Sequence, residues 1–226
     1  MGSLVPAIER PLTRLTLADS VYESLLESIV AGRIRSGQVL TTVALAQQLH
    51  VSRTPVAEAL LRLTADGLVE QLPGRKARVR RFSREEIGDI YEMRKLLEPA
   101  ATYRAASRLD DQSLAVIRDR YDVLASSMKK VDWPQRALEF DLFFHDTIAA
   151  ASGSERLRQD IARYRLLVRA FCRLSGDDRN LREAFAEHGR ILEALERREG
   201  DLARALMISH VDARLQDVLA LLTAVE

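Results

Sequence analysis

Val51-Ser52-Arg53-Thr54-Pro55-Val56-Ala57-Glu58-Ala59-Leu60 has the residue types of a helix start. Ser52 or Thr54 can cap the first turn, because a side-chain oxygen can accept one of the free backbone N–H groups there. Pro55 fits the same turn, where the N–H that proline lacks is not needed. Apolar residues follow at helical spacing and are expected to face inward: Val56, Leu60 and Leu63.

Two interpretations of this stretch are open. It can be an ordinary capped surface helix, or it can be the second helix of a helix-turn-helix, which enters the major groove of DNA. In the second case Ser52, Arg53 and Thr54 lie at the exposed N-terminal end, where such a helix meets base edges and phosphates. The flanking sequence favours the second interpretation.

The flanks predict the other elements of a winged helix. An amphipathic helix is expected to begin near Leu17, and a short second helix covers residues 43–49. Residues 68–72 and 77–82 alternate around a Pro-Gly turn, which predicts a β-hairpin. Three helices followed by a hairpin are the parts of a winged helix-turn-helix.

The predicted hairpin is rich in cations. Arg75, Lys76, Arg78, Arg80 and Arg81 place five basic residues in a stretch of seven. An exposed hairpin edge normally carries some charge, but this density is typical of a surface that contacts phosphates. Arg75, Lys76 and Arg78, at and beside the tip, are therefore the candidate contacts of the wing with double-stranded operator DNA.

The composition of the 226 residues indicates a globular protein, with 47% hydrophobic and 30% charged residues and a single cysteine. Residues 1–82 carry 11 lysines and arginines against 7 acidic residues, whereas residues 83–226 carry 23 against 26. This asymmetry suits a nucleic-acid partner for the first part only. With no signal peptide and no apolar run of about 20 residues, we expect a cytoplasmic protein without a membrane partner.

The second part of the chain predicts an all-α domain. Ser83-Arg84-Glu85-Glu86 has the pattern of a capping box, and it begins a helix at the expected boundary between domains 1–82 and 83–226. Further helical stretches are expected at about residues 111–130, 134–152, 155–175, 180–198 and 201–224. The fold class is therefore mainly α: a winged helix-turn-helix followed by an antiparallel bundle of six or seven helices.

Three of the four histidines lie in this predicted bundle, each on or beside an apolar face of a different helix: His145, His188 and His210. Asp141 precedes His145 by four residues and shares its helical face. The histidines can be separate core residues with one hydrogen bond each. Alternatively, the four side chains can bind one divalent metal ion through three imidazoles and a carboxylate, a ligand set that zinc, nickel and manganese all accept.

Together these residues resemble the GntR family of bacterial transcription regulators, in its FadR-like branch with an FCD effector domain. The DNA-binding signature of the family is matched by residues 51–56, 58–60, Leu63 and 67–69. The effector-domain signature is matched by residues 94–98, 141–145, Ile148, 152–153, His188 and His210.

The resemblance implies a homodimer that binds operator DNA and responds to a small carboxylate effector. The sequence leaves repression and activation of transcription open, and we expect repression. The resemblance also implies that Asp141, His145, His188 and His210 bind the metal ion, and that Arg94 points into the effector pocket. The alternative for Arg94 is an ion pair on the surface. Family members usually carry arginine at Ala57 and glycine at His50 and Lys76, and these departures bear on operator specificity.

Two other functions compete with this one. A metalloenzyme using the Asp/His₃ site would need a general base or acid beside an open metal position. Glu187 is next to His188 in sequence, but neighbours on a helix point about 100° apart. A metal-free regulator that binds acyl-CoA is the other alternative, and it would not need the three histidines. We therefore expect a regulator and not an enzyme.

Overall fold

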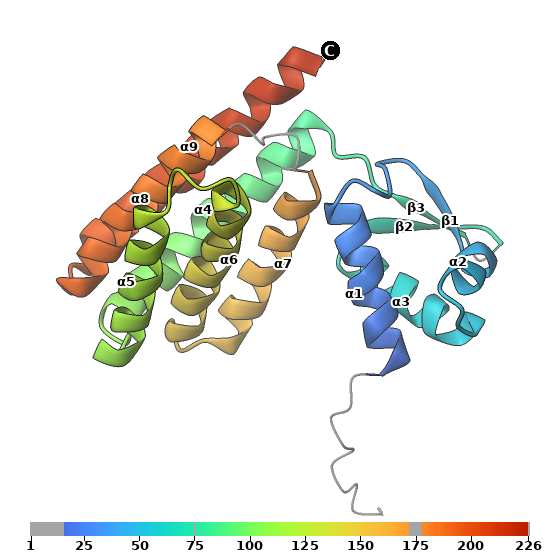
Figure 1. Ribbon diagram of the computed structural model, residues 1–226, viewed down its shortest axis with the longest axis horizontal. Helices are drawn as coiled ribbons and strands as arrows, with labels where there is room; N and C mark the ends of the chain where they lie inside the picture. Colours follow the sequence, from blue (N-terminus) through green and yellow to red (C-terminus); the bar gives the residue numbers. More distant parts are fainter. Residues whose placement is uncertain (1–15, 75, 172–177, 226) are drawn as a thin grey trace, which may run out of the picture. The chain divides into compact units, whose positions relative to one another are not determined.

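The computed structural model describes residues 16–74, 76–171 and 178–225, and the chain divides into two compact units (Figure 1). The first unit is Met1–Arg80 and the second is Arg81–Glu226. Arg75, one of the predicted wing contacts, lies outside the described residues. We call the two parts the N-terminal unit and the helical unit.

The N-terminal unit contains three helices and a small antiparallel sheet. The helices are α1 (Leu17–Val30), α2 (Thr42–Gln48) and α3 (Arg53–Ala65), and the strands are β1 (Val39–Thr41), β2 (Val69–Leu72) and β3 (Lys76–Val79). The predicted hairpin is β2 and β3, and the sheet order is β1-β3-β2. The expectation of a winged helix-turn-helix is confirmed, with a third strand that the sequence analysis did not include.

Helix α3 begins at Arg53, and its inward residues are those expected from their spacing. Val56, Leu60 and Leu63 are buried, and Ser52 occupies the N-cap position. The Ser52 side chain makes no capping hydrogen bond, however. Ser52 therefore occupies the expected N-cap position without capping the helix through its hydroxyl. At the other end of α3 the hydroxyl of Tyr22 donates to Asp66 at 2.6 Å, which fastens α1 to α3.

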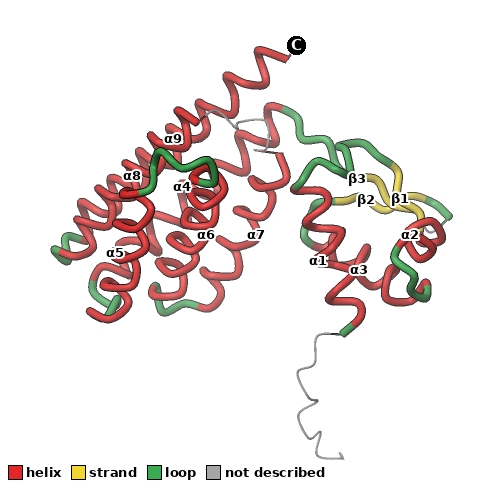
Figure 2. Tube along the Cα trace, in the orientation of Figure 1, coloured by secondary structure: helices red, strands yellow, loops and turns green. Residues whose placement is uncertain are grey.

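The helical unit consists of six described helices (Figure 2). They are α4 (Arg84–Ala106), α5 (Asp111–Ser126), α6 (Trp133–Ala151), α7 (Glu155–Phe171), α8 (Asp178–Glu196) and α9 (Gly200–Val225). The predicted capping box begins α4: the backbone N–H of Glu86 donates to the Ser83 hydroxyl, and the Ser83 N–H donates back to Glu86. Among the described residues, no helix is long and apolar enough to cross a membrane.

The core of the helical unit joins helices that are far apart in sequence. Helix α4 packs against α9, α7 and α6, and α8 packs against α9 and α6. Large side chains at the centre are fully buried, among them Tyr91, Trp133, Phe144, Ile191 and Met207. This apolar packing surrounds a smaller set of polar side chains that come from five of the six helices.

His50 occupies a left-handed turn before α3, with φ of 54°. Side chains other than glycine adopt this region at a cost, which is lowest for asparagine, aspartate and histidine and high for β-branched residues. We expect His50→Gly to leave stability unchanged or raise it by up to about 1 kcal/mol, and His50→Val to lower it by about 1–2 kcal/mol. Urea denaturation of the full chain measures both. Equal stability of the glycine and valine variants would contradict a left-handed His50.

Candidate functional site

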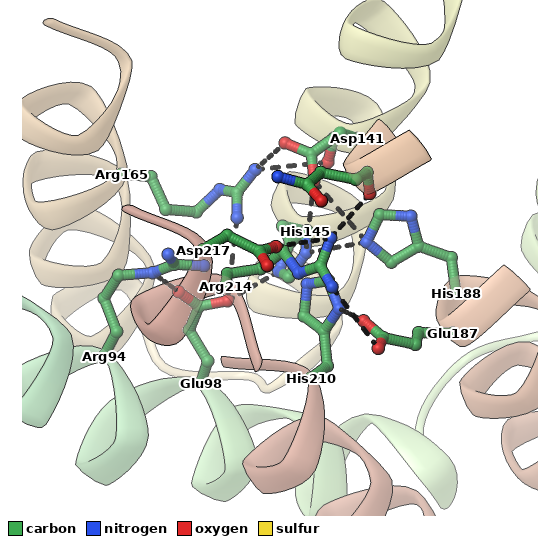
Figure 3. Close-up of polar contacts among 11 residues, drawn as sticks. Arg94, Glu98, Asp141, His145, Arg165, Glu187, His188, His210, Arg214 and Asp217 are labelled. Carbon is green, nitrogen blue, oxygen red and sulfur yellow. Dashed lines mark hydrogen bonds and ion pairs between the residues drawn. The ribbon is translucent and has the colours of Figure 1, made fainter. Parts of the chain in front are cut away.

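The four residues predicted to bind metal come together in the interior of the helical unit (Figure 3). Asp141 and His145 lie on α6, His188 on α8 and His210 on α9. The three imidazoles are buried, and one ligand atom from each of the four residues lies within 4.8 Å of all the others. The helical periodicity of the sequence predicted that each histidine faces inward, and in the structure the three histidine side chains lie close together.

The distances within this cluster fit the donor set of a metal ion. Nε2 of His145 is 3.2 Å from Nε2 of His188, and Oδ1 of Asp141 is 3.5 Å from Nε2 of His188 and 3.7 Å from Nε2 of His145. Ligands bound at about 2.0–2.2 Å to one ion are about 3–3.5 Å apart. The cluster can thus hold a metal ion after small side-chain adjustments.

Two carboxylates contact the Nδ1 atoms of two imidazoles. The sequence analysis did not assign either carboxylate to the site. Oε2 of Glu98 is 2.5 Å from Nδ1 of His145, close in distance although not aligned as a regular hydrogen bond. Oε2 of Glu187 is 2.7 Å from Nδ1 of His210. Carboxylates in this position fix the tautomer and the orientation of a metal-binding histidine. They leave Nε2 of both rings facing the cluster.

The electrostatic environment keeps the imidazoles neutral, the form that binds metal. Burial is the main cause that lowers the pKa of His145, His188 and His210, and nearby positive charge or neighbouring imidazoles lower it further. Burial would raise the pKa of the Asp141 carboxyl, but the charge of Arg165 and the neighbouring imidazoles overcome this effect and lower it. The set therefore consists of three neutral rings and one carboxylate.

Two buried arginines balance the carboxylates of the site. NH2 of Arg165, on α7, donates to Oδ2 of Asp141 at 2.6 Å, on the side away from the imidazoles. Nε of Arg94, on α4, donates to Oε1 of Glu98 at 2.6 Å. Burial would raise the pKa of Glu98, but the charge of Arg94, the contact with His145 and the charge of Arg165 together outweigh burial and hold the pKa well below its usual value. Arg94 is 3% exposed, so it forms a buried ion pair and not the surface pair considered from the sequence.

A cavity of about 120 Å³ lies beside the cluster. Its lining includes Asp141, His188 and His210, together with Arg94, Arg165 and Arg214. Arg214 also contacts the carboxylate beside His210, since its NH2 is 3.5 Å from Oε1 of Glu187. A small anion bound in this cavity would therefore contact residues of the candidate metal site and several guanidinium groups at the same time.

The predicted DNA contacts lie on two elements of the N-terminal unit. Ser52, Arg53 and Thr54 are exposed at the start of α3. Lys76 and Arg78 are exposed on β3, where their side chains alternate with buried Ala77 and Val79. NH1 of Arg78 is 3.1 Å from Oε1 of Glu70 on β2, so part of its charge is balanced within the sheet. Ala57 is also exposed on α3 and presents only a methyl group.

The N-terminal unit has the fold of a winged helix-turn-helix, and the helical unit contains a cluster of three histidines and an aspartate that could hold a metal ion. Residues 17–79 match the bacterial regulatory proteins of the gntR family, and residues 89–213 match the FCD domain. This chain belongs to the GntR family of transcriptional regulators, in the FadR-like subfamily with a C-terminal FCD domain. The family is one of regulators and not of enzymes.

Several relatives have functions in their names. The Nta operon transcriptional regulator of Aminobacter aminovorans is 30% identical over 193 residues, covering 85% of this chain and 90% of that protein. The probable D-xylose utilization operon repressor of Paenarthrobacter nicotinovorans is 28% identical over 209 residues, which is 92% of each chain. The solved structure of E. coli McbR/YncC has a TM-score of 0.76 at 24% identity and covers 94% of this chain and 100% of that one, which supports the fold.

Substitution of Glu187 tests whether the carboxylate that contacts His210 contributes to metal affinity. Glu187→Ala should lower metal affinity by about 10- to 100-fold, because the His210 ring loses the acceptor that orients it. Glu187→Gln keeps a neutral acceptor and should lose less. Titration against a competing chelator measures the affinity, and Glu193→Ala, an exposed change on the same helix, is the matched control. Equal affinities in the Glu187→Ala and Glu193→Ala proteins would remove Glu187 from the site.

Proposed function

We propose that this protein is a ligand-responsive transcriptional repressor whose helical unit binds a divalent metal ion and a small organic acid that alters operator binding. The observation that carries the proposal is the cluster of Asp141 with the three buried imidazoles of His145, His188 and His210. This cluster adjoins a cavity in a chain that also has a GntR DNA-binding domain. Relatives named as repressors of operons for D-xylose utilization and gluconate support the assignment of repression.

The chemistry of the cavity favours a carboxylate ligand. Three neutral imidazoles and one carboxylate would leave a bound zinc, nickel or manganese ion with net positive charge, which attracts an anionic oxygen. Arg94 is the second anchor: its Nε holds Glu98, and a guanidinium has further N–H groups to donate. The effector is thus held between the ion and Arg94.

Two features disfavour the alternative functions. The cavity of about 120 Å³ is well below the ~300–1,000 Å³ of sites for drug-sized ligands, so it suits a small acid better than an acyl-CoA. Glu187 is the acid or base that a metalloenzyme would use, but its carboxylate already contacts His210 and Arg214.

DNA recognition is proposed to use α3 and the wing of two subunits. One recognition helix reads few base pairs, and a twofold dimer doubles the readout over two half-sites. Arg53, Thr54 and Ser52 would contact the major groove, while Lys76, Arg78 and Arg75 would contact phosphates. Because Ala57 cannot make a hydrogen bond through its side chain, base discrimination depends more strongly on Arg53 and Thr54.

His188→Ala tests the metal and effector site. We expect the variant to lose bound metal and the thermal stabilisation that organic acids give, because a ligand that binds only the folded state raises the melting temperature. The measurements are metal analysis by mass spectrometry and a thermal-shift screen of small mono- and dicarboxylic acids, before and after chelation. His50→Ala removes a histidine outside the cluster and should change neither result. A full metal complement in His188→Ala protein would assign the histidines to the core alone.

Arg53→Ala and Lys76→Ala separate sequence recognition from phosphate binding. An operator selected from random DNA with the wild-type protein supplies the probe. Arg53→Ala should reduce discrimination by about 1–3 kcal/mol, whereas Lys76→Ala should weaken all sequences alike and reduce the salt slope by about 1. Arg156→Ala, an exposed charge removal in the helical unit, is the control. Unchanged selectivity of Arg53→Ala would contradict the placement of α3 in the groove.

A further inference from the structure

The outward face of α3 changes in chemistry after the first turn of the helix. Arg53 and Thr54 begin the helix, and their side chains can donate hydrogen bonds to base edges. The exposed positions that follow are Ala57, Glu58 and Leu61, and Leu61 is 56% exposed. They follow Thr54 by three, four and seven residues, so they share its face and point away from the core of the N-terminal unit.

The other polar side chains of α3 are engaged within the N-terminal unit. The guanidinium of Arg62 donates to Asp19 and lies 4.3 Å from the ring centroid of Tyr22, and both partners are on α1. The hydroxyl of Thr64 donates to the carbonyl of Leu60 at 2.8 Å. In α3, all of whose residues are described, the outward positions beyond the first turn therefore present no side-chain donor.

This chemistry restricts the base that the second turn of α3 can recognise. In the major groove guanine offers the acceptors N7 and O6, and adenine offers N7 beside an amino group, so side chains that donate read both purines. The carboxylate of Glu58 can only accept, and Ala57 and Leu61 are apolar. An apolar side chain in the groove favours one feature of a base edge, the C5-methyl group of thymine.

Ala57 is well placed for such a contact when the first turn of α3 holds the helix in the groove. It follows Arg53 by four residues, so it lies one turn further along the helix, about 6 Å away. Base pairs are about 3.4 Å apart along the DNA axis. A base pair about two steps from the one that Arg53 reads therefore lies opposite the Ala57 methyl group.

We propose that Ala57 is a specificity-determining residue, which contacts the C5-methyl group of a thymine at one position of each operator half-site. This inference rests on the proposed placement of α3 in the major groove, and it names the base that the second turn recognises. The contact removes two methyl groups from water. Because 5-methylcytosine carries its methyl group at the same ring position, the contact also makes operator binding sensitive to cytosine methylation at that base pair.

Replacement of thymine by uracil removes the methyl group and keeps the base pair. In an operator selected with the wild-type protein, each thymine is replaced in turn by deoxyuridine in both half-sites, and fluorescence anisotropy measures the dissociation constants. One position should weaken binding about fourfold per half-site, and thus about 15-fold for the palindrome, as expected for one buried methyl group in each. At the same position, 5-methylcytosine paired with guanine should bind about 15-fold more tightly than unmodified cytosine.

Variants of α3 assign the contact to Ala57. In Ala57→Gly protein the uracil and 5-methylcytosine effects at that position should fall below about twofold. Ala65→Gly is the matched control, because it removes an exposed methyl group about two turns further along the same helix and should keep both effects. Ala57→Arg should instead select guanine at that position, because arginine donates to O6 and N7. Circular dichroism verifies that each variant folds.

Three results would overturn this proposal. Equal affinities across the uracil scan would show that no thymine methyl group is recognised, and would leave the placement of α3 standing. A uracil effect that persists in Ala57→Gly protein would assign the contact to another side chain, such as the methyl group of Thr54. Failure of the wild-type protein to select any operator would refute the proposed DNA recognition itself.

Discussion

Arg94, Glu98 and His145 are polar side chains buried at the centre of the helical unit, where water does not solvate them, so each requires a protein partner or a cation. The structure meets this constraint with two chains of contacts: Arg94 pairs with Glu98, which holds His145, and Arg165 pairs with Asp141. Truncating one member of a buried pair leaves the other uncompensated and costs about 3–5 kcal/mol. The packing of α4, α6 and α7 thus depends on the same contacts that shape the candidate metal site.

The sequence predicted the elements that have a local signal. Residue spacing placed the inward side of α3, the capping box placed the start of α4, and a Pro-Gly turn placed the hairpin. Strand β1 has three residues, too few to show an alternating pattern, and it becomes a strand through pairing with β3. Ser52 was placed at the cap, but capping by its side chain depends on a rotamer that the sequence does not determine.

The histidines of the candidate site were predictable from the sequence, whereas the charged residues around them were not. Each imidazole lies on an apolar helical face, a pattern visible within one helix, and the family resemblance indicated that these faces meet. Arg165 and Glu98 are charged residues that are normally exposed, and their burial follows from partners 24 and 47 positions away in sequence. Glu187 points away from His188, as helical geometry requires, and it reaches His210 on α9 instead.

The contact between Glu98 and His145 has a consequence for where the ring hydrogen of His145 resides. Nδ1 of His145 faces the ionised Glu98 and therefore carries the ring hydrogen, so its Nε2 has a free lone pair. A divalent ion bound at Nε2 would thus displace no proton from this ring, and the affinity of this ligand would not fall through competition with protons near neutral pH.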